Sequence, residues 1–422
     1  MGKTFVGFGL GPIQCGLFLF EAHASEAFSR FVISEVDRSL VDAVASNGGR
    51  LTLNIARKTE VDARELPNVE VYDPAEASGR AALVAAVRDS DEMATALPSV
   101  GFYDAGEASP AGVIAEGLSL RKAALPTVIY AAENHNHAAE LLSGAIAAHR
   151  GADCLSSVEI LNTVIGKMSG TITDSRMITR MGLRTIAPGI ERAILVEEFN
   201  RILISRIHLS GYKRGIGVFA EKDNLLPFEE AKLYGHNAIH AAIAYLADYK
   251  GIETIAQAGR DARIMAIARA AFVNESGAAL VRRHGRLGDP LFTPEGYREY
   301  ADDLLDRMVR PTLNDLVARV SRDCARKLGY DDRFFGTMRL ALENGIAPRN
   351  LALGAAAGVV SLIKRQADEK KRIAHLPKTP GELTRTNLGE LLFAIWGAAA
   401  GPDAAALVDL TWEGLRALET AI

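Results

Sequence analysis

The chain has 422 residues, of which 48% are hydrophobic and 24% charged, and its formal net charge is −4. This size allows two or three globular domains, and neither the composition nor the charge indicates a disordered chain, a nucleic-acid-binding surface or an anionic-membrane surface. Three widely spaced cysteines argue against a disulfide framework. We therefore expect a cytoplasmic protein with no nucleic-acid or membrane partner.

The first expected unit is a strand, a glycine-rich turn and a helix. Residues 4–8 form an apolar strand, and the apolar segment 17–24 forms the helix. Gly9 permits a tight turn, and Gly11 lets the backbone approach a pyrophosphate at the helix N-terminus. Gln14 stands where the usual fingerprint has a third glycine, so a generic strand-to-helix connection remains an alternative. The cofactor contacts expected in this turn are Gly9, Gly11, Pro12 and Ile13.

The second expected strand, residues 31–36, carries an acidic residue near its end. Glu35 follows the glycine turn by about 20 residues, the position from which a carboxylate accepts hydrogen bonds from the adenosine ribose. The same charge repels a 2′-phosphate, so the sequence predicts NAD rather than NADP. Asp37 is the rival candidate, but it precedes a helical pattern and is better interpreted as a helix N-cap.

Further short apolar segments alternate with helical patterns through the first 198 residues. This alternation predicts a mostly parallel, doubly wound Rossmann-like sheet, with ligands bound beyond the carboxyl ends of its strands. Thr95 and Ala96 lie at one such end, and Glu133 and Asn134 at another, whereas 168–188 is expected to be an irregular loop. The remaining strands are expected at 51–55, 69–72, 93–97, 127–132, 158–162 and 193–197.

The chain from residue 199 onward changes to helical patterns, which predicts an all-α domain over 199–422 after an NAD-binding domain over 1–198. The helices are expected at 227–250, 252–273, 294–309, 313–328, 333–343, 350–364, 383–399 and 404–422. The first of them is apolar on most sides, yet at about 100° per residue its polar side chains gather on one face. Because isolated buried charges are costly, this cluster indicates a solvated pocket. Its members are Glu229, Lys232, His236, Asn237 and His240.

Four histidines allow a competing hypothesis. His236 and His240 have the spacing of a zinc-binding helix, but the glutamate of the usual protease motif is absent. With His135 and His137 they could serve a metal-dependent hydrolase or lyase. The alternative is that all four are polar groups lining a cleft, with no metal.

The spacing Lys-x4-Asn-x2-His of Lys232, Asn237 and His240 resembles the signature of the polyol-specific long-chain dehydrogenases, the mannitol dehydrogenase family. Other segments follow the order of that family, and the last ones resemble its mannitol-1-phosphate 5-dehydrogenase branch. The resemblance implies a Rossmann-like domain, a helical domain and no catalytic zinc. The other matching segments are Gly9-x-Gly11, Glu35, Glu133-Asn134, Arg322 to Leu328 and Gly345 to Asn350.

By position, the resemblance assigns Lys232 as general base, and burial would lower the pKa of its amine toward that role. It assigns Asn134 and Asn237 as donors to the alkoxide, His240 as the group that orients the substrate, and Glu229 as a gate on the proton path. His236, Arg322 and Lys327 are expected to contact the substrate. Two departures from the family, at Gly166-Lys167 and at Gln14, affect the expected substrate contacts and cofactor turn.

The predicted function is hydride transfer between NAD and a small-molecule polyol, polyol phosphate or aldonate. A non-catalytic nucleotide-binding protein with the same fold is a further alternative. Cationic side chains suit a phosphate and a carboxylate equally, so the sequence leaves the substrate, the direction of reaction and the oligomeric state open.

Overall fold

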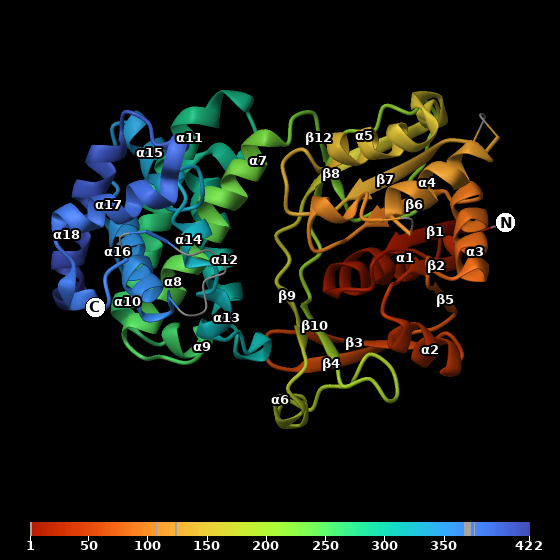
Figure 1. Ribbon diagram of the computed structural model, residues 1–422, viewed down its shortest axis with the longest axis horizontal. Coiled ribbons are helices and arrows are strands. Elements are labelled where there is room, and N and C mark those ends of the chain that lie inside the picture. Colours follow the sequence, from red (N-terminus) through yellow and green to blue (C-terminus); the bar gives the residue numbers. More distant parts are fainter. Residues whose placement is uncertain (1, 107, 123–124, 367–372, 375) are drawn as a thin grey trace. The chain divides into compact units, whose positions relative to one another are not determined.

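The computed structural model describes residues 2–106, 108–122, 125–366, 373–374 and 376–422. The chain divides into two compact units, Met1–Leu226 and Pro227–Ile422. The first unit is built of sheets and helices and the second of helices, which confirms the predicted fold class (Figure 1). Residues 199–226, assigned from sequence to the helical domain, instead contribute two short strands to the first unit, because the chain returns to the sheet before the helices begin.

The first unit is organised around an eight-stranded sheet with the order β12-β11-β8-β7-β6-β1-β2-β5. All pairs described in it are parallel except that of β11 with β8. The chain leaves β1 toward β2 on one side and later pairs β6 on the other, so the carboxyl end of β1 is a topological switch point. The strands are β1 (Lys3–Phe8), β2 (Phe28–Ser34), β5 (Val69–Tyr72), β6 (Glu92–Thr95), β7 (Thr127–Ala131), β8 (Val158–Val164), β11 (Leu203–Ser205) and β12 (Ala220–Lys222).

A second, four-stranded sheet has the order β4-β3-β10-β9. Its strands are β3 (Leu51–Ala56), β4 (Val61–Leu66), β9 (Ser169–Ile172) and β10 (Ala193–Glu197). The strands expected at 51–55 and 193–197 therefore exist but do not belong to the Rossmann-like sheet. The expected loop 168–188 was wrong in part, since it holds β9 and α6 (Ser175–Arg180). Edge strands such as β4 and β9 are polar and half-exposed, so they lack the apolar pattern that marks a buried strand.

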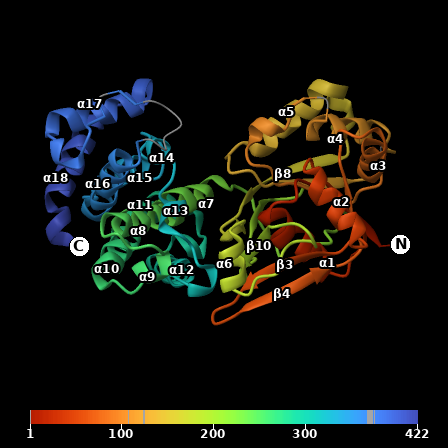
Figure 2. The ribbon, with the colours of Figure 1, turned by 60° about the horizontal axis from the view of Figure 1, so that its bottom comes forward.

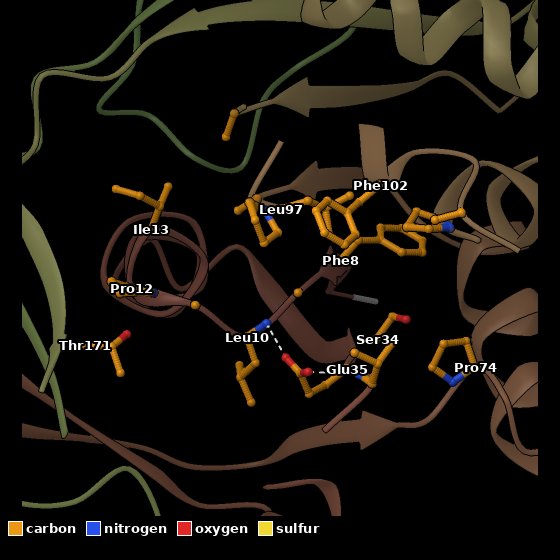
Figure 3. A pocket seen from close by; sticks show the side chains of 18 of the residues that line it. Phe8, Leu10, Pro12, Ile13, Ser34, Glu35, Pro74, Leu97, Phe102 and Thr171 are labelled. Atoms are coloured by element: carbon orange, nitrogen blue, oxygen red, sulfur yellow. Dashed lines mark hydrogen bonds between the residues drawn. The ribbon is translucent and has the colours of Figure 1, made fainter. Parts of the chain in front are cut away.

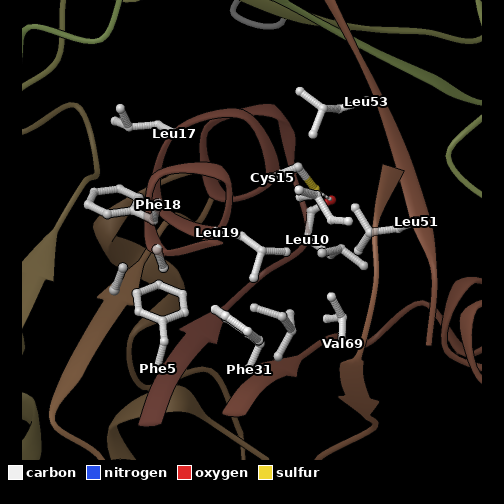
Figure 4. Close-up of a cluster of buried hydrophobic side chains, with 14 of the residues drawn as sticks. Phe5, Leu10, Cys15, Leu17, Phe18, Leu19, Phe31, Leu51, Leu53 and Val69 are labelled. Carbon is white, nitrogen blue, oxygen red and sulfur yellow. Dashed lines mark hydrogen bonds between the residues drawn. The ribbon is translucent and has the colours of Figure 1, made fainter. Parts of the chain in front are cut away.

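The first helix of the chain lies between these two sheets. It consists of a π-helical segment, η1 (Gln14–Leu19), followed by α1 (Phe20–Ala24). Leu17, Phe18 and Leu19 are fully buried in one cluster with side chains of β1, β2 and β3 (Figure 4). A helix covered on both sides must be apolar all round, which explains the unbroken hydrophobic sequence. The packing is close: a Cβ at Gly16 would lie 2.4 Å from Val196 Cγ1.

The other face of the large sheet is covered by three helices, α3 (Ala77–Arg88), α4 (Pro110–Ser119) and α5 (Ala138–Arg150) (Figures 1 and 2). The side chains of β1 point alternately to the two faces of the sheet. Phe5 packs in the cluster around η1, whereas Val6 and Phe8 pack in the cluster under these helices. The remaining helix of this unit that bears on the site is α2 (Arg38–Ser46), which begins directly after Asp37.

The second unit is built around one long helical segment, α7 (Leu226–Glu230), η4 (Ala231–Asn237) and α8 (Ala238–Tyr249). α8 is buried from Ala241 to Ala247 and packs against α16 (Arg349–Lys364), where a Cβ at Gly354 would lie 3.0 Å from Ala242 Cβ. The other elements are α9 (Ile255–Ala258), α10 (Ala262–Ala270), η5 (Ala271–Gly277), α11 (Ala278–His284), α12 (Pro294–Met308), α13 (Val317–Val320), α14 (Cys324–Lys327), α15 (Phe335–Glu343), α17 (Arg385–Trp396) and α18 (Ala404–Ala421).

Within the described residues, one helical segment, Ala262–Leu287, is long and apolar enough to cross a membrane by length and composition alone. Of its most apolar window 56% is buried inside the unit. It is therefore best explained as a core helix.

Glu275, on η5, anchors the start of α16. Its buried carboxylate accepts hydrogen bonds from the backbone N–H and the side-chain amide of Asn350, both at 2.7 Å, and from Leu351 N at 2.8 Å. Burial raises the pKa of this carboxyl, and the N–H groups oppose that shift. Gly345 turns the chain just before this contact, at φ +67°. The segment from Gly345 to Asn350, noted in the sequence as a family match, thus has a structural role.

We expect Glu275→Gln to lower the free energy of unfolding by about 1–2 kcal/mol, because one oxygen is replaced by a donor that faces other donors. Thermal and urea unfolding of the purified variant measure this. Glu343→Gln, which alters an exposed carboxylate, is the matched control. A Glu275→Gln variant as stable as the wild type would contradict the anchoring role.

Candidate functional site

A cavity of about 520 Å³ opens in the first unit beyond the carboxyl ends of β1, β2 and β6. Figure 3 shows Pro12 and Ile13 on one side, Phe102 and Pro74 on the other, and Glu35 between them. This is the switch-point position inferred for the large sheet. Six of the seven residues predicted to bind the cofactor line this cavity: Gly9, Gly11, Pro12, Ile13, Glu35 and Ala96.

The two glycines of the turn have different roles. Gly9 has φ +84°, and a side chain there would also approach Ala96 O to 3.0 Å. A Cβ at Gly11 would meet nothing within 4 Å, so the missing side chain leaves open space beside the helix N-terminus. That space suits the pyrophosphate of a dinucleotide, because a helix N-terminus presents N–H groups and a positive dipole end to an anion.

Glu35 is fixed in place by backbone donors. Its Oε2 accepts from Leu10 N at 2.7 Å, and its Oε1 accepts from Val36 N at 2.8 Å and Asp37 N at 2.9 Å. The carboxylate thereby joins the glycine turn to the end of β2. An ionised carboxylate offers about four acceptor positions, so one remains for a ribose hydroxyl.

Asp37 caps α2, as predicted, by accepting from Leu40 N. It also forms an ion pair with Arg192, whose Nη2 lies 2.6 Å from Asp37 Oδ2. The hydrogen bond from Arg192 is the main reason why the pKa of Asp37 is lowered. Arg192 lines the cavity from the second sheet, just before β10. Sequence reasoning missed it because it lies far along the chain from the nucleotide turn.

Thr95 does not line the cavity. It is buried, and its hydroxyl donates to Glu133 Oε2 at 2.9 Å, while Leu97 N donates to Glu133 Oε1 at 2.9 Å and Tyr103 O–H donates to the same carboxylate. Glu133 therefore secures the wall of the cavity that follows β6. Asn134 comes next in the chain and is exposed.

The metal hypothesis finds no support. His135 and His137 are exposed, with ring centroids 6.1 Å apart, and they belong to a different unit from His236 and His240. No group of three or more His, Cys, Asp or Glu that could hold a metal ion occurs in the described part of the chain.

In the second unit, the Lys232–Asn237 motif lies on the π-helical segment η4 rather than on a regular α-helix. In a π-turn the hydrogen bonds run from residue i to i+5, which is the spacing of Lys232 and Asn237. Gly235 lies in the middle of this turn, and a Cβ there would approach Tyr297 Oη to 2.6 Å and Phe272 Cε2 to 2.8 Å. Close packing against neighbouring helices therefore accompanies the local distortion, and π-turns of this kind occur often at functional sites.

The amine of Lys232 has a pKa lowered to about 8. Burial is the largest cause, the positive charge of Arg333 adds to it, and the carboxylate of Glu229 opposes it. His236 is buried beside Lys232, and burial together with His240 and several nearby cations lowers its pKa well below the usual value. At neutral pH His236 is therefore uncharged.

His240 is held by an acidic residue that the sequence analysis did not identify. Its Nε2 lies 3.1 Å from Asp315 Oδ2, within ion-pair distance although outside good hydrogen-bond geometry. Arg319 binds the other oxygen of Asp315, with Nε to Oδ1 at 2.8 Å. Burial raises the pKa of Asp315, but His240 and Arg319 outweigh it, and the net pKa is lowered. Asp315 thus stays ionised beside the imidazole.

Arg333 lies near Lys232, near His236 and near a second buried lysine, Lys327. Lys327 is buried, its amine donates to Val320 O, and burial followed by the charges of Arg333 and Arg326 lowers its pKa to about 8. Arg333, whose Nε donates to Asp332 Oδ1 at 2.8 Å, thus influences both lysines. Arg322 is exposed, and its Nε donates to Arg319 O at 3.3 Å.

The fold and these two sites define the class: a dinucleotide-type α/β unit followed by a helical unit with a desolvated lysine. Residues 224–374 match the family model of the mannitol dehydrogenase C-terminal domain. A mannitol-1-phosphate 5-dehydrogenase from Brevibacillus brevis is 31% identical over 194 residues, which span 46% of this chain and 48% of that protein. These two matches confirm the resemblance to the mannitol dehydrogenase family that was noted in the sequence.

Two solved structures share the fold over nearly the whole chain. Mannitol 2-dehydrogenase from Pseudomonas fluorescens, solved with NAD and D-mannitol, has a TM-score of 0.70 at 17% identity and covers 99% of this chain and 92% of its own. A D-sorbitol dehydrogenase solved without substrate has a TM-score of 0.73 at 14% identity, covering 99% and 93%. Such low identities establish the architecture alone.

Proposed function

We propose that the protein is an NAD-dependent oxidoreductase that transfers a hydride between NAD and a polyol, polyol phosphate or aldonate. The observation that carries the proposal is the Lys232 amine, which is desolvated on a π-turn and has a pKa of about 8. The match of residues 224–374 to the mannitol dehydrogenase C-terminal domain, and the similarity to a mannitol-1-phosphate 5-dehydrogenase, a mannitol 2-dehydrogenase and a D-sorbitol dehydrogenase, support the polyol class.

The first unit supplies the nucleotide site. Gly11 leaves room for the pyrophosphate, the Glu35 carboxylate is placed to accept from the adenosine ribose, and its charge disfavours a 2′-phosphate. Bound NAD would supply the hydride acceptor, which is the cofactor's own chemistry. The residues of the chain bind and orient it.

Lys232 is proposed to accept the proton of the substrate hydroxyl. A general base works best when its pKa lies near the working pH, and a pKa of about 8 leaves a substantial neutral fraction of the amine near that pH. The carboxylate of Glu229 opposes the shift, and Glu229 is proposed to tune the amine and to pass its proton onward. Asn134 and Asn237 remain the proposed donors to the developing alkoxide, and side-chain N–H groups suit that role.

His240 is proposed to orient the substrate, with Asp315 fixing its ring. The buried cations Lys327 and Arg333 of the same unit favour a substrate that carries a negative group, because they concentrate positive charge in a poorly solvated place. Both a phosphate and a carboxylate satisfy this charge. The match to a mannitol-1-phosphate 5-dehydrogenase favours the phosphate.

The test is NADH formation, followed at alkaline pH with NAD⁺ and a panel of polyols, their 1-phosphates and aldonates. We expect turnover with at least one polyol-type substrate, unaffected by a metal chelator. NADH binding without turnover on the whole panel would instead support a non-catalytic nucleotide-binding protein. Loss of activity with the chelator would contradict a zinc-independent reaction.

A further inference from the structure

We infer that the Asp37–Arg192 ion pair is a second determinant of cofactor choice. The pair keeps the Arg192 guanidinium bound to Asp37, so that Arg192 does not bind the 2′-phosphate of NADP. This inference rests on the proposed NAD-binding function of the cavity in the first unit. It concerns two side chains other than those of the glycine turn and of Glu35.

The cavity carries a charged residue of each sign. Among the described residues that line it, the charged ones are Glu35 and Arg192. Glu35 is placed at the adenosine ribose by its position after β2 and is held rigidly by three backbone N–H groups. A 2′-phosphate, with a charge near −2, would face this carboxylate and would need a cation in compensation.

Arg192 is the cation at the cavity, and it is already paired with Asp37. The guanidinium Nη2 lies 2.6 Å from Asp37 Oδ2, and the two side chains are 31% and 34% exposed. The guanidinium reaches the cavity from the second sheet, whereas Asp37 stands two residues after Glu35 at the start of α2. A 2′-phosphate would therefore have to displace a fixed carboxylate from Arg192 while meeting another at Glu35.

Asp37 can be changed without dismantling the surrounding structure. Its second role is to cap α2 through Leu40 N, and asparagine caps a helix as well as aspartate does. Asp37→Asn thus keeps the cap and removes the charge that holds Arg192. Glu35→Gln is less informative, because it would also disturb the hydrogen bonds that join the glycine turn to β2.

The experiment measures dissociation constants of NAD⁺ and NADP⁺ by calorimetry for the wild type, Asp37→Asn, Arg192→Gln and the double variant. We expect Asp37→Asn to bind NADP⁺ about tenfold more tightly, because a partly exposed charge-assisted contact is gained, with NAD⁺ affinity changed less than about twofold. Adding Arg192→Gln to Asp37→Asn should remove the gain. Asp37→Ser, which also preserves a cap, serves as a second variant if Asp37→Asn folds poorly.

An unchanged NADP⁺ to NAD⁺ ratio in folded Asp37→Asn would overturn the inference and leave the proposed function standing. A gain that persists in the double variant would equally reject Arg192 as the cation involved. If the wild type binds neither nucleotide, the proposed function itself fails, and the inference fails with it.

Discussion

Replacing Lys232 with alanine is expected to lower turnover by ~10²–10⁴-fold, the usual contribution of a placed proton-transfer group. The amine sits on η4 in a desolvated setting that lowers its pKa to about 8, so the neutral form can take a proton from an alcohol. NADH binding should persist, because the cavity that we assign to the nucleotide lies in the first unit. Steady-state turnover and NADH fluorescence titration of the same preparation measure the two effects.

The pH dependence follows from the same group. The base is the deprotonated amine, so the rate of alcohol oxidation should rise as the pH is raised through about 8 and fall below it. Lys250→Ala is the matched control, because Lys250 ends the same helical segment and pairs at the surface with Asp261. Near-normal turnover in Lys232→Ala, or a wild-type profile that shows no such group, would reject Lys232 as the base.

The fold was predictable where one element carries its own signal. The apolar pattern of β1 and its glycine turn predicted the Rossmann-like unit, and the apolar sequence after His240 predicted a buried helix. The π-turn at Ala231–Asn237 was not predictable, since it accompanies the close packing of Gly235 against Phe272 and Tyr297 on other helices. A projection at α-helical angles placed Lys232 and Asn237 on one helix face but could not show the π-turn in which they lie.

The residues of the candidate site likewise divide into those with a local sequence signal and those without one. The position of Glu35 at the cavity was predictable from its distance after the turn, and the position of Lys232 on a mostly buried helical segment from the sequence around it. Arg192, Asp315 and Arg333 were not, because each acts on a residue that is distant along the chain, and no periodicity links such pairs. Strands with half-exposed polar sequences, such as β4, were not predicted for a related reason. Their own residues carry no strand pattern, and they are recognised only by their pairing with a neighbouring strand.

The departure of Gln14 from the usual fingerprint is matched by a second residue, Gly7 on β1. The Gln14 side chain is fully buried and lies over Gly7, where a Cβ would approach its Nε2 to 2.1 Å and Ile33 Cδ1 to 2.6 Å. Within the described part of the chain, neither amide atom of Gln14 has a hydrogen-bond partner. The strand therefore has a glycine where the first helix carries a large side chain, and the two positions are expected to depend on each other.

We expect Gly7→Ala to lower the free energy of unfolding by about 3 kcal/mol, because the added methyl overpacks a site whose neighbours are enclosed. In Gly7→Ala/Gln14→Ala the clash with Gln14 and the two unpaired polar atoms are removed, while Ile33 Cδ1 still lies close, so part of that loss should be recovered. Urea unfolding of the two single variants and the double variant, arranged as a cycle, measures the coupling. If the double variant is no more stable than Gly7→Ala, the two positions are independent, and the altered fingerprint needs another explanation.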